Sequence, residues 1–214
     1  MIQNLLLGTR NRNKVAEISA MLKDLPVKIV TLLDYPEIGP VIEDRNTYHE
    51  NALKKALTFA RHTGIVTIAD DSGLEVDAMA GRPGVHSSRF AGDDATDEEN
   101  IEKLLRLMVG VEREKRKARF VCVIALARPS GEVDFIEGEL YGEIGFDRSG
   151  ENGFGYDPVF IMPDTGRSLA QMGLEEKNRI SHRGKAMAKV RRLLMNESGS
   201  QKSVVRSQEE SLNS

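Results

Sequence analysis

Two adjacent carboxylates, Asp70 and Asp71, precede Ser72 and Gly73 and follow a short apolar run, residues 65–69. This run predicts a buried strand, so the acidic pair is expected where the strand ends, a place at which α/β proteins collect ligands. Adjacent carboxylates repel one another unless a cation or a protonated neighbour intervenes, and hard divalent cations prefer such oxygen ligands. The pattern indicates metal-assisted chemistry, although the same four residues are also typical of a plain turn.

A second cluster lies in residues 8–14, between a predicted strand and a predicted helix. Such a loop offers backbone N–H groups, a hydroxyl, amides and cationic side chains to one anion, and phosphate fits that description. It lacks the glycine spacing and the terminal Lys-Ser/Thr of a P-loop, so a solvated basic turn is the alternative. The candidate phosphate-binding residues are Thr9, Arg10, Asn11, Arg12, Asn13 and Lys14.

A third cluster, residues 152–160, combines two glycines with two aromatic residues. The glycines let the backbone approach a ligand closely, and the ring faces of Phe154 and Tyr156 suit stacking with a planar base. The same rings would also suit an ordinary hydrophobic core. The cluster therefore predicts a base-binding site only in combination with the others.

The fourth cluster, residues 175–185, carries Lys177, His182 and Arg183. These side chains suit a phosphate or the polar edge of a base, while a charged face with a helix cap is the structural alternative. One ligand class explains all four clusters together: metal-bound phosphates attached to a stacked base. The sequence thus favours a nucleotide.

Alternating strands and helices must position these clusters. The predicted strands are residues 2–7, 27–32, 65–69, 119–127 and 133–139, with residues 140–146 as an extension. The predicted helices begin after the caps Asn13, Thr47, Thr96 and Ser181, of which Thr47 and Thr96 are followed by a capping-box glutamate. The apolar stripe predicted for the second helix is Leu53, Ala56, Leu57 and Ala60. A hairpin connection at residues 128–132 makes part of the sheet antiparallel.

Composition sets the broad class. The chain of 214 residues has a net charge of -3, which gives no global attraction to nucleic acid or to anionic membranes. No apolar run has the length of a membrane span and no signal region is evident, so a cytoplasmic protein is expected. The one cysteine, Cys122, lies in an apolar run and is predicted to be a buried core thiol. We expect one domain over residues 1–195 and a disordered tail over residues 196–214.

Short motifs occur in a fixed order along the chain: Thr9-Arg10-Asn11-Arg12-Asn13-Lys14, Glu50-Asn51-Ala52, Ala69-Asp70-Asp71-Ser72-Gly73-Leu74, Gly81-Arg82-Pro83-Gly84-Val85, Ser88-Arg89-Phe90-Ala91-Gly92, Gly153-Phe154-Gly155-Tyr156-Asp157-Pro158 and Ser181-His182-Arg183-Gly184. In this order, and over essentially everything before the tail, the chain resembles the inosine triphosphate pyrophosphatase family. The resemblance implies Mg²⁺-dependent hydrolysis of ITP, dITP and XTP to the monophosphate and pyrophosphate by a homodimer. It also implies an elongated, two-lobed α/β fold around a central mixed β-sheet, with the active site in a cleft between the lobes.

The resemblance also assigns roles to residues of this chain. It places the metal-linked catalytic acid at Asp71, with Ser72 contacting substrate and Glu43 at an acidic position associated with the metal. Asp70 and the loop from Thr9 to Lys14 would contact the phosphates. The residues implied to hold the base and ribose are Phe154, Gly155, Tyr156, Asp157, Lys177, His182 and Arg183. Arg45 stands where many relatives carry a glycine.

The mechanism suggested by these roles is attack of water on the α-phosphorus, with Asp71 orienting or deprotonating the water and Lys14 offsetting charge on the leaving pyrophosphate. A donor aimed at the 6-keto oxygen would accept inosine and xanthine and leave adenine mispaired. A Maf-like pyrophosphatase acting on modified pyrimidines and a less selective NTPase are alternative enzymes. A non-catalytic nucleotide-binding regulator would not need Asp70, Asp71 and Glu75. A haloacid-dehalogenase-type phosphatase fits poorly, because its aspartates are spaced Asp-x-Asp.

Overall fold

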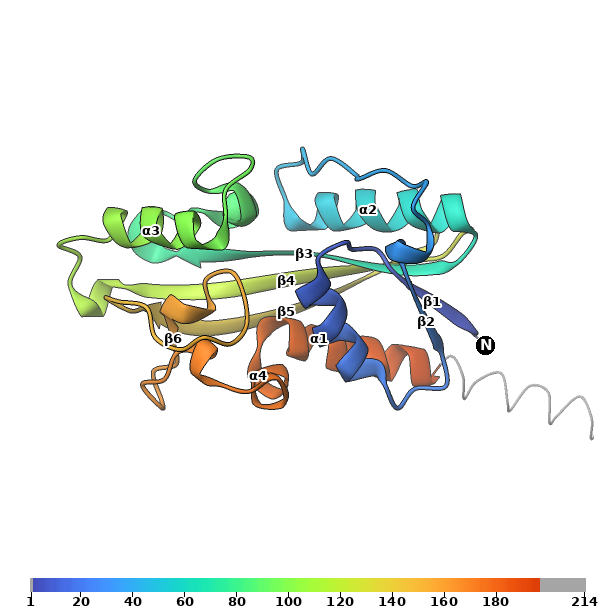
Figure 1. Ribbon diagram of the computed structural model, residues 1–214. Helices are drawn as coiled ribbons and strands as arrows, with labels where there is room; N and C mark the ends of the chain where they lie inside the picture. Colours follow the sequence, from blue (N-terminus) through green and yellow to red (C-terminus); the bar gives the residue numbers. More distant parts are fainter. Residues whose placement is uncertain (1, 197–214) are drawn as a thin grey trace, which may run out of the picture.

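The computed structural model describes residues 2–196, and within them six strands form one mixed sheet (Figure 1). The strands are β1 (Asn4–Leu7), β2 (Lys28–Thr31), β3 (Val66–Val76), β4 (Lys117–Ala127), β5 (Val133–Ile144) and β6 (Phe160–Ile161), in the order β2-β1-β3-β4-β5-β6. β1 pairs in parallel with β2 and β3, and the pairs from β3 to β6 are antiparallel. The predicted α/β class with a mixed sheet is confirmed. The two-lobed shape stays a prediction.

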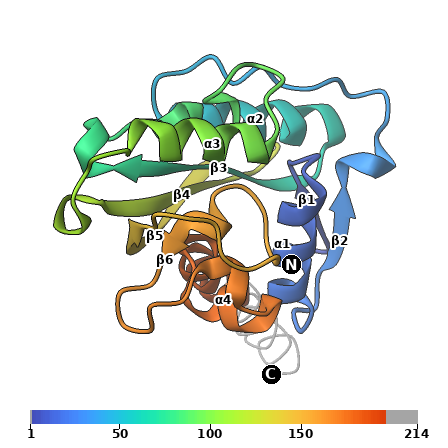
Figure 2. The same ribbon diagram turned by 60° about the vertical axis from the view of Figure 1, so that its left-hand side comes forward.

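Helices lie on both sides of this sheet. They are α1 (Arg12–Leu22), α2 (Tyr48–Thr63), α3 (Asp97–Leu107) and α4 (Leu174–Ile180), followed by a helix over residues 182–196. In Figures 1 and 2, α2 and α3 lie on one side of the sheet, and α1, α4 and the helix 182–196 lie on the other. None of the helices in residues 2–196 combines the length and the apolar character needed to cross a bilayer. The predicted disordered tail lies outside the described residues, except for Asn196, which is helical.

Side-chain caps precede α1, α2 and α3, with one correction to the prediction, whereas α4 begins after Gly173 without such a cap. The Thr47 and Thr96 hydroxyls accept hydrogen bonds from the N–H groups of Glu50 and Glu99, as predicted. Helix α1, however, is capped by Asn11, whose side-chain oxygen accepts hydrogen bonds from the N–H groups of Asn13 (2.9 Å) and Lys14 (3.1 Å). The prediction of Asn13 as the cap was wrong because two asparagines of equal capping propensity lie two residues apart.

Strand β3 is longer than its apolar run predicts. Instead of ending at Ala69, it continues to Val76, so Asp70 and Asp71 lie within the strand and not after it. The cause is long-range pairing, because β4 follows β3 antiparallel from Thr67 to Val76. β1, in contrast, pairs with β3 only as far as Ile68. The acidic pair therefore lies just beyond the end of the parallel strands, where one edge of β3 is no longer covered by β1.

The buried face of α2 matches the predicted one only in part, since Ala56 and Ala60 are buried as predicted. Its buried side chains are Asn51, Ala52, Lys55, Ala56, Phe59 and Ala60, whereas Leu53 and Leu57 are only partly buried. The small alanines pack against alternate residues of β3 and β4, and close approach of helix and sheet encloses the polar side chains beside them. Asn51 and Lys55 are thus turned toward the sheet.

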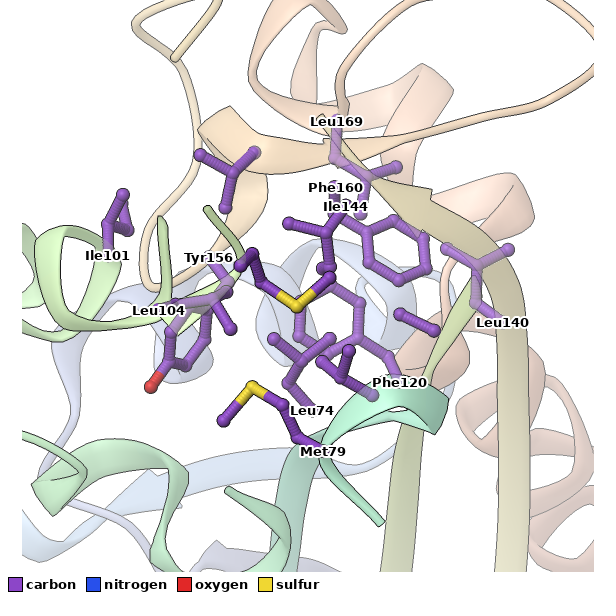
Figure 3. Packing of buried hydrophobic residues seen from close by; sticks show 14 of the residues in the cluster. Leu74, Met79, Ile101, Leu104, Phe120, Leu140, Ile144, Tyr156, Phe160 and Leu169 are labelled. Carbon is purple, nitrogen blue, oxygen red and sulfur yellow. The ribbon is translucent and has the colours of Figure 1, made fainter. Parts of the chain in front are cut away.

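One core cluster joins β3, β4 and β5 to α3 and to the segment that contains β6 (Figure 3). Phe120, Phe160 and Tyr156 lie in this cluster, and the Tyr156 hydroxyl donates a hydrogen bond to the carbonyl of Ser87 at 2.8 Å. Cys122 belongs to a neighbouring cluster with α1 and the helix 182–196, where burial raises the pKa of its thiol to about 11. The prediction that Cys122 is a buried core thiol is confirmed.

Gly138 on β5 sets the position of the helix 182–196. A Cβ atom at Gly138 would lie 2.1 Å from the carbonyl oxygen of His182 and 2.7 Å from the backbone nitrogen of Ala186. Only glycine permits such an approach of helix backbone to strand backbone. Ser181 caps this helix as predicted, because its hydroxyl oxygen accepts a hydrogen bond from the N–H of Gly184 at 3.0 Å. The first turn, with His182 and Arg183, is thereby fixed against the sheet.

Candidate active site

A cleft of about 340 Å³ opens beside the part of β3 that extends beyond β1. Its walls come from the loop after β1, the segment before α2, β3, the loop at residues 154–157, α4 and the start of the helix 182–196. The predicted site residues that line it are Thr9, Arg10, Asn11, Lys14, Glu43, Asp71, Ser72, Phe154, Gly155, Tyr156, Asp157, Lys177, His182 and Arg183. Arg12 and Asn13 belong to the first turn of α1 and do not line the cleft.

Asp70 and Asp71 point to opposite faces of the sheet, because neighbouring residues of a strand alternate. Asp70 faces α1 and the helix 182–196, where its Oδ2 lies 2.9 Å from Lys14 Nζ and 3.1 Å from Arg183 Nη2. The Ser72 hydroxyl donates to the same oxygen at 2.9 Å. Burial opposes ionisation of Asp70, but Lys14 and Arg183 outweigh it and hold the pKa well below 3.8. The side chains of Lys14 and Arg183 therefore offset the charge of Asp70 in this structure.

Asp71 faces α2. Asn51 Nδ2 donates a hydrogen bond to Asp71 Oδ2 at 3.1 Å, and Lys55 Nζ lies 3.8 Å from Oδ1. Burial, together with the negative charge of Glu43, outweighs Lys55 and raises the pKa of Asp71 to about 6. A carboxylate with this pKa is ionised at neutral pH and is a better proton acceptor than an ordinary aspartate. Glu75 shares the face of Asp71 but pairs with Arg119 at 2.7 Å, away from the cleft.

Glu43 and Lys55 complete the α2 side of the cleft. Lys55 Nζ lies 2.7 Å from Glu43 Oε1 and donates to the carbonyl of Asp70 at 2.7 Å. Burial alone would lower the pKa of Lys55, but Glu43 and Asp71 reverse this and raise it. Lys55 is thus a buried cation shared by two acidic groups. Arg45 lies two residues after Glu43 in the segment before α2. Glu43 nevertheless lines the cleft.

Asp71 and Glu43 have the chemistry to bind a metal cation together with a substrate. Among residues 2–196, no group of three or more His, Cys, Asp or Glu side chains is arranged to hold a metal ion. Mg²⁺, however, is commonly bound by one or two carboxylates together with substrate phosphates. Asp71 and Glu43 both line the cleft and supply this donor chemistry. The two carboxylates therefore fit Mg²⁺ bound jointly with a phosphorylated substrate.

Among the cations of residues 9–14, Lys14 and Arg10 line the cleft and Arg12 does not. Lys14 is partly accessible there, with 17 % of its side chain exposed. The Arg10 guanidinium instead donates to the carbonyls of Tyr35 and Ile38, so it ties this loop to the segment after β2. Thr9 accepts a hydrogen bond from the N–H of Asn11 at 3.2 Å. Lys14, in the first turn of α1, therefore marks the part of the cleft best suited to an anion.

Phe154 forms an aromatic surface beside two cations on the other side of the cleft. Lys177 Nζ lies 4.8 Å from the centre of the Phe154 ring, and the Arg183 guanidinium lies 5.6 Å from it. Asp157 accepts a hydrogen bond from the N–H of Phe154 at 2.9 Å and forms an ion pair with Lys177. Tyr156 lines the cleft but is only 5 % exposed and packs in the core. Phe154 is therefore better placed than Tyr156 to stack against a base.

His182 is held as a neutral side chain. Its ring stacks on Phe120, with the ring centres 4.7 Å apart and the planes inclined by 15°. Burial, followed by the positive charges of Arg183 and Lys177, lowers the pKa of His182 well below 6.5. A neutral imidazole has one N–H donor and one acceptor nitrogen. His182 can thus contribute a directional hydrogen bond at the cleft without adding charge.

Sequence reasoning gave no role to three buried polar residues that contact the site: Glu17, Lys55, and Asn51, which it named only within a motif. Glu17, on α1, pairs with Arg183 at 2.6 Å and with Lys177 at 2.9 Å. For Asn51 and Lys55 the available signal was their spacing of four residues beside the alanines at 52, 56 and 60. This spacing places both polar residues on one helix face next to small residues.

Comparisons with known proteins place the chain in a family. Residues 5–193 match the model of the Ham1 family. The chain is 47 % identical over 190 residues to a dITP/XTP pyrophosphatase of Desulforamulus reducens, covering 89 % of this chain and 94 % of that protein. It is 45 % identical to a dITP/XTP pyrophosphatase of Shouchella clausii, covering 87 % and 93 %. A HAM1 protein structure from Coxiella burnetii superposes with a TM-score of 0.83 at 38 % identity, covering 91 % and 99 %.

Proposed function

The chain belongs to the Ham1 family, and we propose that it hydrolyses the noncanonical purine nucleoside triphosphates ITP, dITP and XTP to the monophosphate and pyrophosphate. The observation that carries this proposal is the position of Asp71. It is a buried carboxylate with a pKa raised to about 6, and it lies in one cleft with the N-terminus of α1 and the Phe154 ring. The family membership confirms the resemblance drawn from the sequence motifs. Such an activity would clear deaminated purines from the nucleotide pool.

We propose Mg²⁺ as the cofactor, with Asp71 and Glu43 as its protein ligands. When bound, it would neutralise phosphate charge and polarise the phosphate oxygens. Asp71 would accept a proton from the attacking water as the new bond between the water oxygen and the α-phosphorus forms. The bond from the α-phosphorus to the bridging oxygen then breaks, and pyrophosphate leaves. Lys14 would offset the charge on the pyrophosphate.

The base would be held on the opposite side of the cleft. Phe154 offers a ring face, and Lys177, His182 and neighbouring groups offer hydrogen-bond donors at its edge. A donor directed at the 6-keto oxygen of hypoxanthine or xanthine would face the amine of adenine and lose its acceptor. A site that requires a particular hydrogen bond rejects the analogue that lacks it far more strongly than a purely hydrophobic pocket does. We therefore expect discrimination against ATP to arise from this side of the cleft.

Pyrophosphate release measured with Mg²⁺ across ITP, dITP, XTP, GTP, ATP and a modified pyrimidine triphosphate tests this function. The expected result is strong preference for ITP, dITP and XTP, with the nucleoside monophosphate as the other product. Preference for the modified pyrimidine would instead support a Maf-like activity. Orthophosphate as the primary product, or equal rates on all purines, would contradict the proposal.

We also propose that the protein acts as a homodimer in the cytoplasm, as the sequence resemblance implies. The face of β5 that carries Phe135 and Tyr141 supports association, because these side chains are 44 % and 61 % exposed. Exposed aromatic groups are enriched at protein interfaces. Light scattering after size-exclusion chromatography should give twice the 23.7 kDa mass of the chain. The mass of a single chain at micromolar concentration would contradict the dimer.

A further inference from the structure

Asn51 is a fully buried side chain in the first turn of α2 and contacts two parts of the cleft at once. Its Nδ2 donates to Asp71 Oδ2 at 3.1 Å and to the carbonyl of Arg45 at 3.3 Å. Its Oδ1 accepts a hydrogen bond from the N–H of Arg45 at 3.0 Å. One amide group therefore joins β3 to the loop that carries Glu43.

This loop matters because it supplies one of the two carboxylates of the cleft. Arg89 donates to the carbonyl of Glu43 at 2.9 Å, and Lys54 donates to the carbonyl of Ile42 at 2.8 Å, so the loop is held along its length. Neither of these contacts involves Asp71. Lys55 Nζ donates to Glu43 Oε1 at 2.7 Å but lies 3.8 Å from Asp71 Oδ1, beyond hydrogen-bond distance, so Asn51 supplies the side-chain hydrogen bond to the Asp71 carboxylate. Asn51 is thus suited to fix the relative orientation of the Asp71 carboxylate and this loop.

A second asparagine shows what such a side chain does without the catalytic contact. Asn100 lies four residues after the cap Thr96 of α3, as Asn51 lies four residues after the cap Thr47 of α2, in the pattern Thr-x-x-Glu-Asn. It is 2 % exposed, donates to the carbonyl of Ser88 at 3.1 Å and accepts from the N–H of Ala91 at 2.7 Å. Both asparagines therefore hold the backbone of a preceding loop. The hydrogen bond to a carboxylate in the cleft distinguishes Asn51.

We infer that Asn51 is a positioning residue, which orients the Asp71 carboxylate and holds it in register with the loop that carries Glu43. The inference rests on the proposed function for its kinetic consequence. Groups that orient catalytic carboxylates or metal ligands typically change activity by about 10–100-fold when they are replaced. A misoriented Asp71 should reduce the chemical step more than substrate binding, because the base and phosphate contacts lie on other elements. The expected signature is a lower kcat with a nearly unchanged KM.

The test compares Asn51→Asp and Asn51→Ala with the matched control Asn100→Ala, using dITP hydrolysis, thermal unfolding and crystal structures. Asn51→Asp keeps the acceptor for the Arg45 N–H, loses both donated hydrogen bonds and adds a negative charge beside Asp71, whereas Asn51→Ala removes the donated bonds without adding charge. Both Asn51 variants should lower kcat by about 10–100-fold. Asn100→Ala should lower the melting temperature while its kcat changes less than threefold. In the structure of Asn51→Ala, which adds no charge, the Asp71 carboxylate should be turned away from its wild-type orientation.

Two outcomes would overturn the inference. One is an equal loss of kcat in Asn100→Ala, because this would show that loop anchoring in general, and not the contact with Asp71, matters. The other is an Asp71 carboxylate that keeps its wild-type orientation in Asn51→Ala. A wild-type protein that does not hydrolyse dITP would contradict the proposed function alone, and the crystal structures would then decide the role of Asn51.

Discussion

Replacement of Asp71 by asparagine should lower the rate of pyrophosphate release by about 10²–10⁴-fold, the usual contribution of a general base. The substitution keeps the size of the side chain and an oxygen that can accept the hydrogen bond from Asn51, but it removes the proton acceptor. Because burial raises the pKa of Asp71 to about 6, the ionised carboxylate is destabilising at neutral pH. The variant should therefore unfold at the same temperature as the wild type or at a higher one.

Glu75→Gln is the matched control for this experiment. Glu75 lies on the same strand and the same face as Asp71, and the substitution removes the same charge, but Glu75 pairs with Arg119 outside the cleft. Steady-state rates with ITP should separate the two variants, with Glu75→Gln close to wild type. Wild-type turnover by Asp71→Asn would eliminate Asp71 as the catalytic base. A large loss of activity in both variants would show that the negative charge of β3 is required, and not the Asp71 carboxylate in particular.

Replacement of Glu17 by glutamine should cost about 3–5 kcal/mol of folding free energy at neutral pH, the usual range for breaking a buried ion pair. Glu17 is 3 % exposed and lies between Arg183 and Lys177, at 2.6 Å and 2.9 Å. A neutral amide leaves both cations buried with less compensation. Their remaining partners, Asp70 for Arg183 and Asp157 for Lys177, soften the loss but do not replace a full charge.

The pH dependence of this effect follows from the ionisation of Glu17. Burial would raise its pKa, but Arg183 and then Lys177 outweigh burial and lower the pKa from the ordinary value of 4.5. A group with a depressed folded pKa stabilises the fold above its unfolded pKa, and this contribution is lost as the pH falls through the folded value. The gap between wild type and Glu17→Gln should therefore be full above about pH 5 and shrink in more acidic solution.

Urea denaturation from pH 7 into the acid range measures this gap. Glu176→Gln serves as the control, because Glu176 pairs with Arg167 at the surface with 48 % of its side chain exposed. Exposed pairs contribute about 0–1 kcal/mol, so this control should change stability little at any pH. A loss for Glu17→Gln that is no greater than for Glu176→Gln, or a gap that does not vary with pH, would show that the buried network contributes little to folding.

Much of the local structure could be predicted because its causes lie within a few residues. The Thr47 cap, the Thr96 capping box and the Ser181 cap all depend on neighbouring backbone groups, and all three are present. The side-chain chemistry of the cleft could also be anticipated, because cations, carboxylates and an aromatic ring occur in short clusters. The uncertainty between Asn11 and Asn13 shows the limit, since their local signals are equal.

The sequence by itself determined the mixed α/β character of the chain, most helix starts and the chemical types of the residues in the cleft. Only the tertiary structure decided that β3 continues through Asp70 and Asp71, because its antiparallel partner β4 begins some forty residues later. That continuation sends the two carboxylates to opposite faces, where different helices supply their partners. The burial of Glu17 and Asn51 likewise depends on the tertiary structure. Their partners are distant in sequence, and burial of a polar side chain becomes favourable only when those partners are brought together.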